Sequence, residues 1–209
     1  MNLHAVTEWL SAVCPWLVLV LCLQRAVGWR GWTLRGWGLL LWPGAIALGV
    51  LLLPIKGIVI ARWVAGISAN VSIPFAGMLA VAVWERAFRR RVFSLRDWDA
   101  GWSFGAISGL ALYPLALGVG SVDPYEWGWR FSPLFVVMGA LTGWLIWKQS
   151  WFGCLLLLAV IAFHLRLLES SNYWDYLLDP IYSLVSFIAV GRRLAAHVRG
   201  GVWLPRGAP

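Results

Sequence analysis

The chain has 209 residues, of which 61% are hydrophobic and only 12% are charged. About a quarter of the residues in a soluble domain are usually charged, and a soluble fold of this length cannot bury so much apolar surface. The composition therefore excludes an ordinary soluble protein and predicts an all-α integral membrane protein. The net charge of +8 does not indicate a nucleic-acid partner. The arginines lie beside apolar segments, where membrane topology and anionic lipids account for them.

Seven apolar stretches follow one another, each about long enough for a membrane helix. The predicted helices cover residues 6–24, 37–54, 66–85, 103–121, 131–147, 150–166 and 176–194. They use most of the length, so residues 1–198 are expected to form a single transmembrane domain, followed by a mobile cytoplasmic tail at 199–209. The first stretch is predicted to be a helix rather than a cleaved signal, because no basic residue precedes it and no small-x-small site follows it.

The third of these helices is the least regular. The apolar stretch after Gly57 is too long and too interrupted for one plain crossing. An interfacial or re-entrant piece at 57–70, followed by a helix from Ser72, fits it better. Serine is a good helix cap, and Pro74 is tolerated in a first turn.

Small and aromatic residues add two expectations about packing. Most of the 17 Trp residues lie near the ends of apolar stretches, where they anchor a chain at the membrane–water boundary. Glycines at a spacing of four create small helix faces for close approach, in one set at Gly101, Gly105 and Gly109 and in another at Gly139 and Gly143. The string GWSFG within the first set is interpreted as packing, since a serine nucleophile of this pattern needs a strand-to-helix turn.

The basic residues predict the orientation. All but four of the 17 Lys and Arg residues fall on one side of the predicted topology, the exceptions being Lys56, Arg62, Arg130 and Arg166. Because basic loops stay in the cytoplasm, the N-terminus is expected outside and the C-terminus inside. The bias toward Trp, Gly and Arg over Lys suggests a GC-rich bacterium, so the expected location is the bacterial cytoplasmic (inner) membrane.

Three segments on the predicted outer face combine charged residues with turn-forming residues. They are ARWVAGISANVSIP from Ala61, SVDPYEWGWRFSP from Ser121 and HLRLLESSNYWDYLLDP from His164. Charges at this depth are costly unless they are paired or used, so the segments are expected to meet in one polar site. Guanidinium groups match phosphate, and a carboxylate could act as a base if there is catalysis. The candidate catalytic residues are Glu169 and Asp175, and the candidate substrate-binding residues are Arg62, Asn70, Asp123, Tyr125, Arg130, His164, Arg166 and Asn172.

Several residues of these segments also have a structural interpretation. Asp179 before Pro180 and Ser132 before Pro133 fit helix starts, and Asp123 before Pro124 fits a turn. Asp175 and Asp179 would share a helix face only if a helix ran unbroken through Pro180. The sequence has no ligand spacing for a metal or haem and no phosphate loop, so no cofactor is expected.

The leading functional hypothesis is the binding or modification of an anionic lipid, or of a lipid-linked envelope precursor, at the outer leaflet. Whether the protein is an enzyme is left open. One alternative is a non-catalytic membrane subunit that docks a larger envelope enzyme or assembly complex. Another is a small-solute permease, against which the apolar helix centres argue. The expected partners are membrane lipids and a membrane protein.

Overall fold

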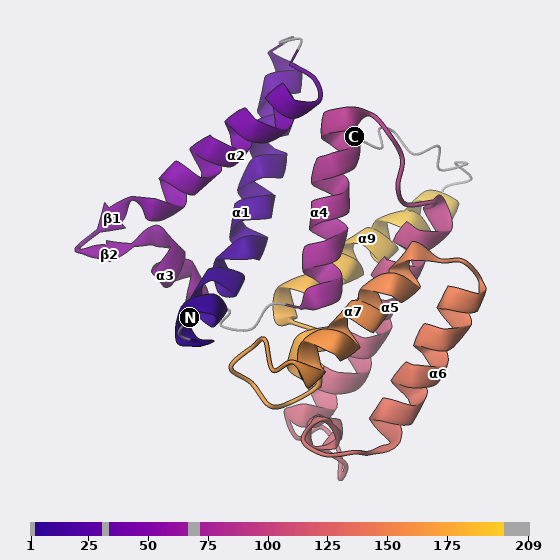
Figure 1. Cartoon of the computed structure of the whole chain (residues 1–209). Helices are drawn as coiled ribbons and strands as arrows, with labels where there is room; N and C mark the ends of the chain where they lie inside the picture. Colours follow the sequence, from indigo (N-terminus) through magenta and orange to yellow (C-terminus); the bar gives the residue numbers. More distant parts are fainter. Residues whose placement is uncertain (1–2, 31–33, 67–71, 199–209) are drawn as a thin grey trace. The chain divides into compact units, whose positions relative to one another are not determined.

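The computed structural model describes residues 3–30, 34–66 and 72–198 (Figure 1). These residues form nine α-helices, one 3-10 helix and one short β-hairpin, which confirms the all-α class. They divide into two compact units. Among the described residues, the first unit consists of 3–30, 34–66 and 76–92, and the second of 72–75 and 93–198.

Each of the seven predicted helices has a long counterpart in the structure. These counterparts are α1 (Leu3–Trp29), α2 (Trp37–Leu52), α4 (Ile73–Phe88), α5 (Leu95–Ala116), α6 (Pro133–Trp147), α7 (Trp151–His164) and α9 (Pro180–Val198).

By length and composition, two of the described helices can cross a bilayer. They are Ser11–Trp29 within α1, and α9. The helices α2, α6 and α7 are apolar but have only 16, 15 and 14 residues. At ~1.5 Å per residue, they are shorter than a hydrocarbon core of ~30 Å. The number of crossings therefore stays a prediction.

The predicted break before α4 is present, whereas the interfacial or re-entrant position of residues 57–70 stays a prediction. Arg62 lies in the separate short helix α3 (Ile60–Ala65), and Pro74 lies in the first turn of α4. The Oγ of Ser72 accepts the N–H of Phe75 at 3.3 Å, so serine caps this helix.

A β-hairpin between α2 and α3 was not predicted. Its strands are β1 (Pro54–Ile55) and β2 (Ile58–Val59), and they pair antiparallel. The turn consists of Lys56 and Gly57, with φ of 52° and 80°. Two consecutive residues with positive φ are typical of a tight hairpin, and this conformation is unusual for lysine.

The helix α5 begins at Leu95 rather than at residue 103, because a capping box starts it. The Oγ of Ser94 accepts the N–H of Asp97 at 3.2 Å, and the Asp97 carboxylate accepts the N–H of Ser94 at 2.9 Å. These reciprocal bonds satisfy N–H groups that a helix start leaves open. The predicted start of this helix at residue 103 was therefore wrong.

In the first unit, Gln24 joins three helices. This α1 side chain is 1% exposed. Its Nε2 donates to the carbonyl of Leu39 in α2 at 3.1 Å and to that of Val83 in α4 at 3.3 Å. The N–H of Gly36 also donates to the carbonyl of Ala87 at 2.8 Å. This end of α4 is therefore fastened to both neighbouring helices.

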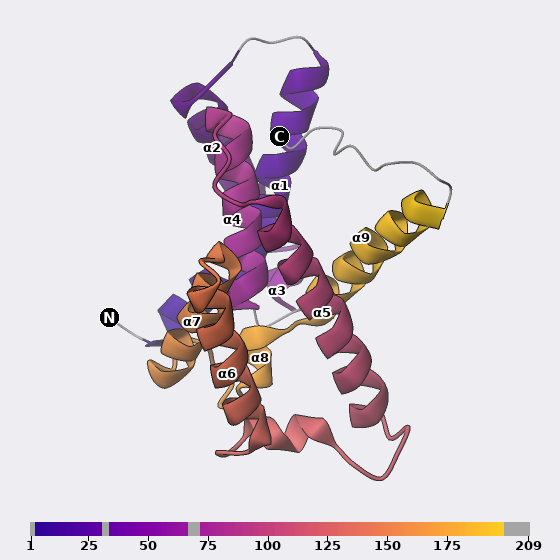
Figure 2. The same cartoon turned by 90° about the vertical axis from the view of Figure 1, so that its right-hand side faces the viewer.

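In the second unit, α5 and α9 cross in close contact (Figures 1 and 2). A Cβ built at Gly105 would overlap the hydroxyl of Ser186 and would lie 2.8 Å from Cε2 of Tyr182. One built at Gly109 would lie 2.5 Å from Oγ of Ser183. The predicted packing role of glycine is confirmed for this helix pair.

The second glycine pair, Gly139 and Gly143, makes no such close contact among the described residues. No described atom lies within 4 Å of a Cβ built at Gly139 or Gly143 of α6, and both residues are exposed. The helix packs on α7 through another glycine, Gly153, whose Cβ would lie 2.8 Å from that of Leu145. Within the described part of the chain, the close approach predicted at Gly139 and Gly143 does not occur.

Candidate functional site: the loop platform

Two of the three polar segments meet in the second unit. One covers residues 121–132 and contains the 3-10 helix η1 (Pro124–Gly128). The other covers residues 165–179 and contains the short helix α8 (Trp174–Leu177). We call these two segments together the loop platform. Each lies between two long helices of the second unit.

Side-chain caps shape the first segment. The Oδ1 of Asp123 accepts the N–H of Tyr125 at 2.8 Å, and the Oγ of Ser132 accepts the N–H of Leu134 at 3.2 Å. Both bonds confirm the interpretation of these residues as a turn opener and a helix cap, each preceding a proline.

Asn172 joins the two segments of the loop platform. It is fully buried. Its Nδ2 donates to the carbonyl of Tyr125 at 3.0 Å, and its Oδ1 accepts the N–H of Trp174 at 2.9 Å. The segments approach so closely that a side chain on Gly128 would overlap the Asn172 amide. The indole N–H of Trp174 adds a bond of 2.8 Å to the carbonyl of Pro124. In this arrangement Asn172 stabilises the platform itself.

The phenol of Tyr125 reaches Asp175. Its oxygen lies 3.2 Å and 3.1 Å from the two carboxylate oxygens. Burial, and then the negative charge of Asp175, raise the pKa of Tyr125 to about 12. The phenol therefore stays protonated at neutral pH and donates to the carboxylate. The Asp175 carboxylate therefore already accepts a hydrogen bond from within the platform.

The third polar segment joins this region through its last residues. Ser72 donates its N–H to Oδ2 of Asp179 at 3.2 Å and its hydroxyl to the carbonyl of Leu177 at 2.9 Å. The other carboxylate oxygen of Asp179 accepts the N–H of Tyr182 at 2.7 Å, which confirms the predicted cap of α9. Burial raises the pKa of Asp179, although hydrogen bonds from backbone N–H groups act in the opposite direction. Asp179 thus links the start of α4 to the start of α9.

The candidate arginines of the platform lie at exposed positions. Arg130 follows η1, and Arg166 follows α7 with a φ of 50°. Glu169 is also exposed. His164 ends α7, where its Nδ1 lies 2.9 Å from the carbonyl oxygen of Val160.

Two other candidates lie elsewhere. Arg62 belongs to the first unit, where it is exposed on α3. Asn70 lies outside the described residues. The convergence of all three segments therefore stays a prediction, whereas the contact between residues 121–132 and 165–179 is part of the second unit.

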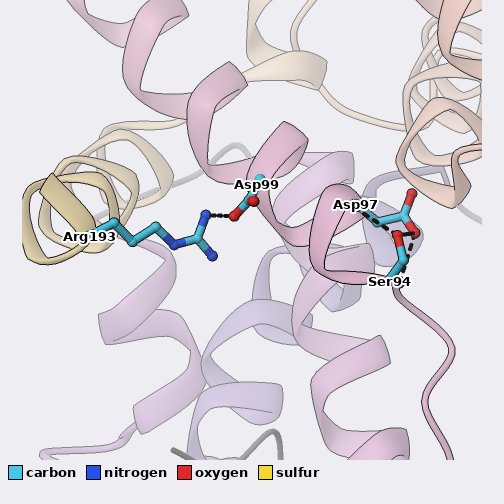
Figure 3. Close-up of polar contacts among 4 residues, drawn as sticks. All are labelled: Ser94, Asp97, Asp99 and Arg193. Carbon is cyan, nitrogen blue, oxygen red and sulfur yellow. Dashed lines mark hydrogen bonds and ion pairs between the residues drawn. The ribbon is translucent and has the colours of Figure 1, made fainter. Parts of the chain in front are cut away.

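The opposite end of α5 holds polar contacts that the sequence analysis missed (Figure 3). Ser94 and Asp97 point toward each other, and Asp99 forms an ion pair with Arg193 of α9. Asp97 is 3% exposed, and its carboxylate also accepts the hydroxyl of Ser150 before α7 at 2.6 Å. Burial opposes its ionisation, but the hydrogen bonds from Ser150 and Ser94 outweigh burial and place the pKa of Asp97 below its usual value. These carboxylates fasten helix ends together.

The loop platform offers exposed cationic groups for interaction with an anion. Exposed guanidinium groups lie on a hydrogen-bonded scaffold whose Asp123 and Asp175 already accept internal hydrogen bonds. In the described ranges, no three His, Cys, Asp or Glu residues are grouped so that they could hold a metal ion. No family model matches the chain, and no curated protein or solved structure is similar to it.

Proposed function

We propose that the chain is a multi-pass protein of a bacterial cytoplasmic membrane, with about seven crossings. The surface of its long helices supports this proposal. Large apolar side chains are exposed on them, such as Trp42 on α2 (66%), Val137 on α6 (61%) and Leu184 on α9 (61%). Each such side chain left in water forgoes about 1.5–3 kcal/mol of burial, whereas lipid solvates it. A bilayer can thin locally around helices that are shorter than its core.

The loop platform is proposed to lie on the outer face and to bind the anionic headgroup of a lipid or of a lipid-linked envelope precursor. The observation that carries this proposal is that the aspartates and the arginines of the platform are in different environments. Asp123, Asp175 and Asp179 accept the protein's own hydrogen bonds, whereas Arg130 and Arg166 are exposed. An exposed guanidinium can form two parallel hydrogen bonds to phosphate oxygens. Asp175 and Glu169 become candidate bases only if the bound lipid is also turned over.

Lipid binding by the purified protein in phosphatidylcholine nanodiscs tests the proposal. Phosphatidylglycerol or a polyprenyl phosphate is added, and bound lipid is measured by native mass spectrometry. The double variant R130Q/R166Q should bind at least about tenfold more weakly, a loss of roughly 1.4 kcal/mol. The control R96Q/R192Q removes the same charge from exposed arginines at the other ends of α5 and α9 and should bind nearly as well as the wild type. Equal losses in the two double variants would refute a site on the loop platform.

Two further measurements test separately whether the carboxylates contribute to lipid binding and whether the chain spans the membrane. The variants E169Q and D175N should retain lipid binding, because neither removes a guanidinium. Membranes washed at alkaline pH should retain the wild-type protein, and its release into the wash would refute a multi-pass arrangement.

A second candidate function is a non-catalytic membrane subunit that docks a larger envelope enzyme or assembly complex. The exposed face of α6 favours it, since Gly139 and Gly143 leave room for another helix to approach closely. The variant G143L should then lose a partner that co-purifies with the wild type while keeping its lipid binding. Unchanged co-purification would exclude this face as the docking surface.

A further inference from the structure

Arginines and aromatic rings gather at one end of the first unit, where α1 and α4 finish and α2 begins. The N–H of Gly36 bonds to Ala87 at this end, and the ring of Trp37 packs against Phe88 with 5.2 Å between centroids. The basic residues of these helix ends and of the segments that adjoin them are Arg25, Arg30, Arg35, Arg86, Arg89, Arg90 and Arg91.

The Arg86 side chain of α4 reaches α1 one turn from Arg25. Gly28 lies one turn after Arg25 on the same side of α1. A Cβ built at Gly28 would lie 3.4 Å from Nη2 of Arg86, so this guanidinium lies against the bare backbone of α1. Arg86 is half-buried, and the positive charge of Arg25 acts on it. Two like charges in this position repel each other, and an anion that binds between them reduces this repulsion.

The backbone around both arginines is fixed, so the helices do not separate to relieve this repulsion. Gln24, the neighbour of Arg25, bonds to Leu39 and Val83 on two other helices. Ala87, the neighbour of Arg86, accepts the N–H of Gly36.

Glu85, which precedes Arg86 in the sequence, accepts a hydrogen bond from the segment that follows α4. Glu85 is 2% exposed, and its Oε1 accepts the N–H of Val92 at 2.7 Å. This bond helps to hold the chain that leaves α4, where residues 89–91 carry three exposed arginines.

The aromatic rings place the arginine pair at the depth of lipid headgroups. Trp84 and Phe88 lie one turn apart on α4, before and after Arg86 in the sequence, with ring centroids 4.2 Å apart, and Trp37 packs edge-on against both. Trp37 and Trp84 are 61% and 41% exposed. Partly exposed indole rings of membrane proteins lie at the boundary between acyl chains and headgroups. A guanidinium at this level is within reach of lipid phosphate.

We propose that Arg25 and Arg86 together bind one phosphate group, carried by an anionic phospholipid of the leaflet at this end of the first unit. The two guanidinium groups supply a fork of donors from each helix, and the anion between them removes their mutual repulsion. The lipid source rests on the proposed membrane location, whereas the site itself is independent of the loop platform.

Binding and thermal unfolding of the purified full-length protein test this site. Phosphatidylglycerol is the ligand, and phosphatidylcholine is the neutral comparison. The variants R25Q and R86Q should each bind phosphatidylglycerol at least about tenfold more weakly. The matched control R91Q removes an exposed arginine at the same end and should bind within about twofold of the wild type. The variant R86K keeps the charge and so protects the fold, yet it should bind at least about threefold more weakly because ammonium lacks the planar fork.

Inorganic phosphate distinguishes the two possible sources of the anion. Competition at millimolar concentration would support the paired-arginine site with free phosphate as its occupant, and the absence of competition would support the lipid. Equal weakening in R91Q and R86Q would overturn the proposal, since the arginines would then act only as diffuse charge. Equal stabilisation by the two lipids would also overturn it. A wild-type protein that stays soluble without detergent would refute the membrane location. In that case, weaker binding of inorganic phosphate by R25Q and R86Q than by the wild type would still support the arginine site.

Discussion

Replacing Gly105 by alanine should weaken the contact between α5 and α9, whereas the same change at Gly139 should not. The added Cβ at position 105 would overlap the Ser186 hydroxyl and crowd the ring of Tyr182 at 2.8 Å. Overpacking of this kind costs about 1–3 kcal/mol. No described atom lies within 4 Å of the new methyl group at position 139. Alanine favours a helix over glycine by about 0.8–1 kcal/mol at both positions, so the difference between the variants isolates packing.

The assay is thermal unfolding in detergent, followed through tryptophan fluorescence. For a chain of about 200 residues, 1 kcal/mol shifts the Tm by about 2–4 °C, so G105A should unfold roughly 2–12 °C below G139A. Adding Ser186→Gly to G105A should recover part of the loss, because it removes the hydroxyl that the new methyl group overlaps. If the two single variants unfold within about 1 °C of each other, the α5–α9 contact is not the tight one described.

Three further predictions concern the loop segments, the helix ends and the topology. The variant N172A should lose about 2–6 kcal/mol, because the Tyr125 carbonyl and the Trp174 N–H lose their partner at about 1–3 kcal/mol each. The exposed control S171A should change stability by less than about 0.5 kcal/mol, and equal thermal stability of the two variants would contradict the platform. Since the pKa of Asp97 is lowered in the folded protein, its stabilising effect is present above the unfolded pKa of about 3.9 and is lost as the pH falls through the lower folded value. The difference in stability between the wild type and D97N should therefore stay constant above about pH 5 and narrow as the pH falls below about 4 towards the lower folded value, and a difference that is constant down to about pH 2 would argue against this role. In intact cells and a cysteine-free background, Glu126→Cys should react with an impermeant thiol reagent and Arg90→Cys should not, and the reverse pattern would invert the topology.

The helix positions could be predicted because apolar stretches and their starting residues are local signals. Ser72, Ser132 and Asp179 all cap the helices that the sequence assigned to them. The start of α5 was missed although its signal was present. The pattern SLRD from Ser94 forms a capping box, which is a local signal for a helix start within a polar stretch. The hairpin at residues 54–59 had a weaker signal, because a two-residue turn seldom has lysine in its first position.

The candidate site could be predicted in part. The meeting of residues 121–132 with residues 165–179 agrees with the expected convergence of polar segments, but the roles of individual residues did not follow from their type. Segments without long helices leave many backbone groups to be satisfied, and nearby polar side chains serve them. Asn172 does so for the carbonyl of Tyr125, which is 47 residues away in the sequence. No local pattern encodes such a pairing, so sequence analysis assigned Asn172 to substrate binding.

The arginines differ in whether the surrounding protein alone can stabilise their positive charge. A basic residue near the C-terminal end of a helix is stabilised by the carbonyl groups there, so Arg166 after α7 needs no anion to explain it. The same reasoning explains Arg86 alone, in the last turn of α4. It does not explain why the Arg86 guanidinium lies against α1 one turn from Arg25, because the carbonyl groups of each helix end do not remove the repulsion between the two charges. Anion binding therefore has a stronger structural reason at this pair than at the exposed arginines of the loop platform, and R86Q should weaken phosphatidylglycerol binding more than R166Q does.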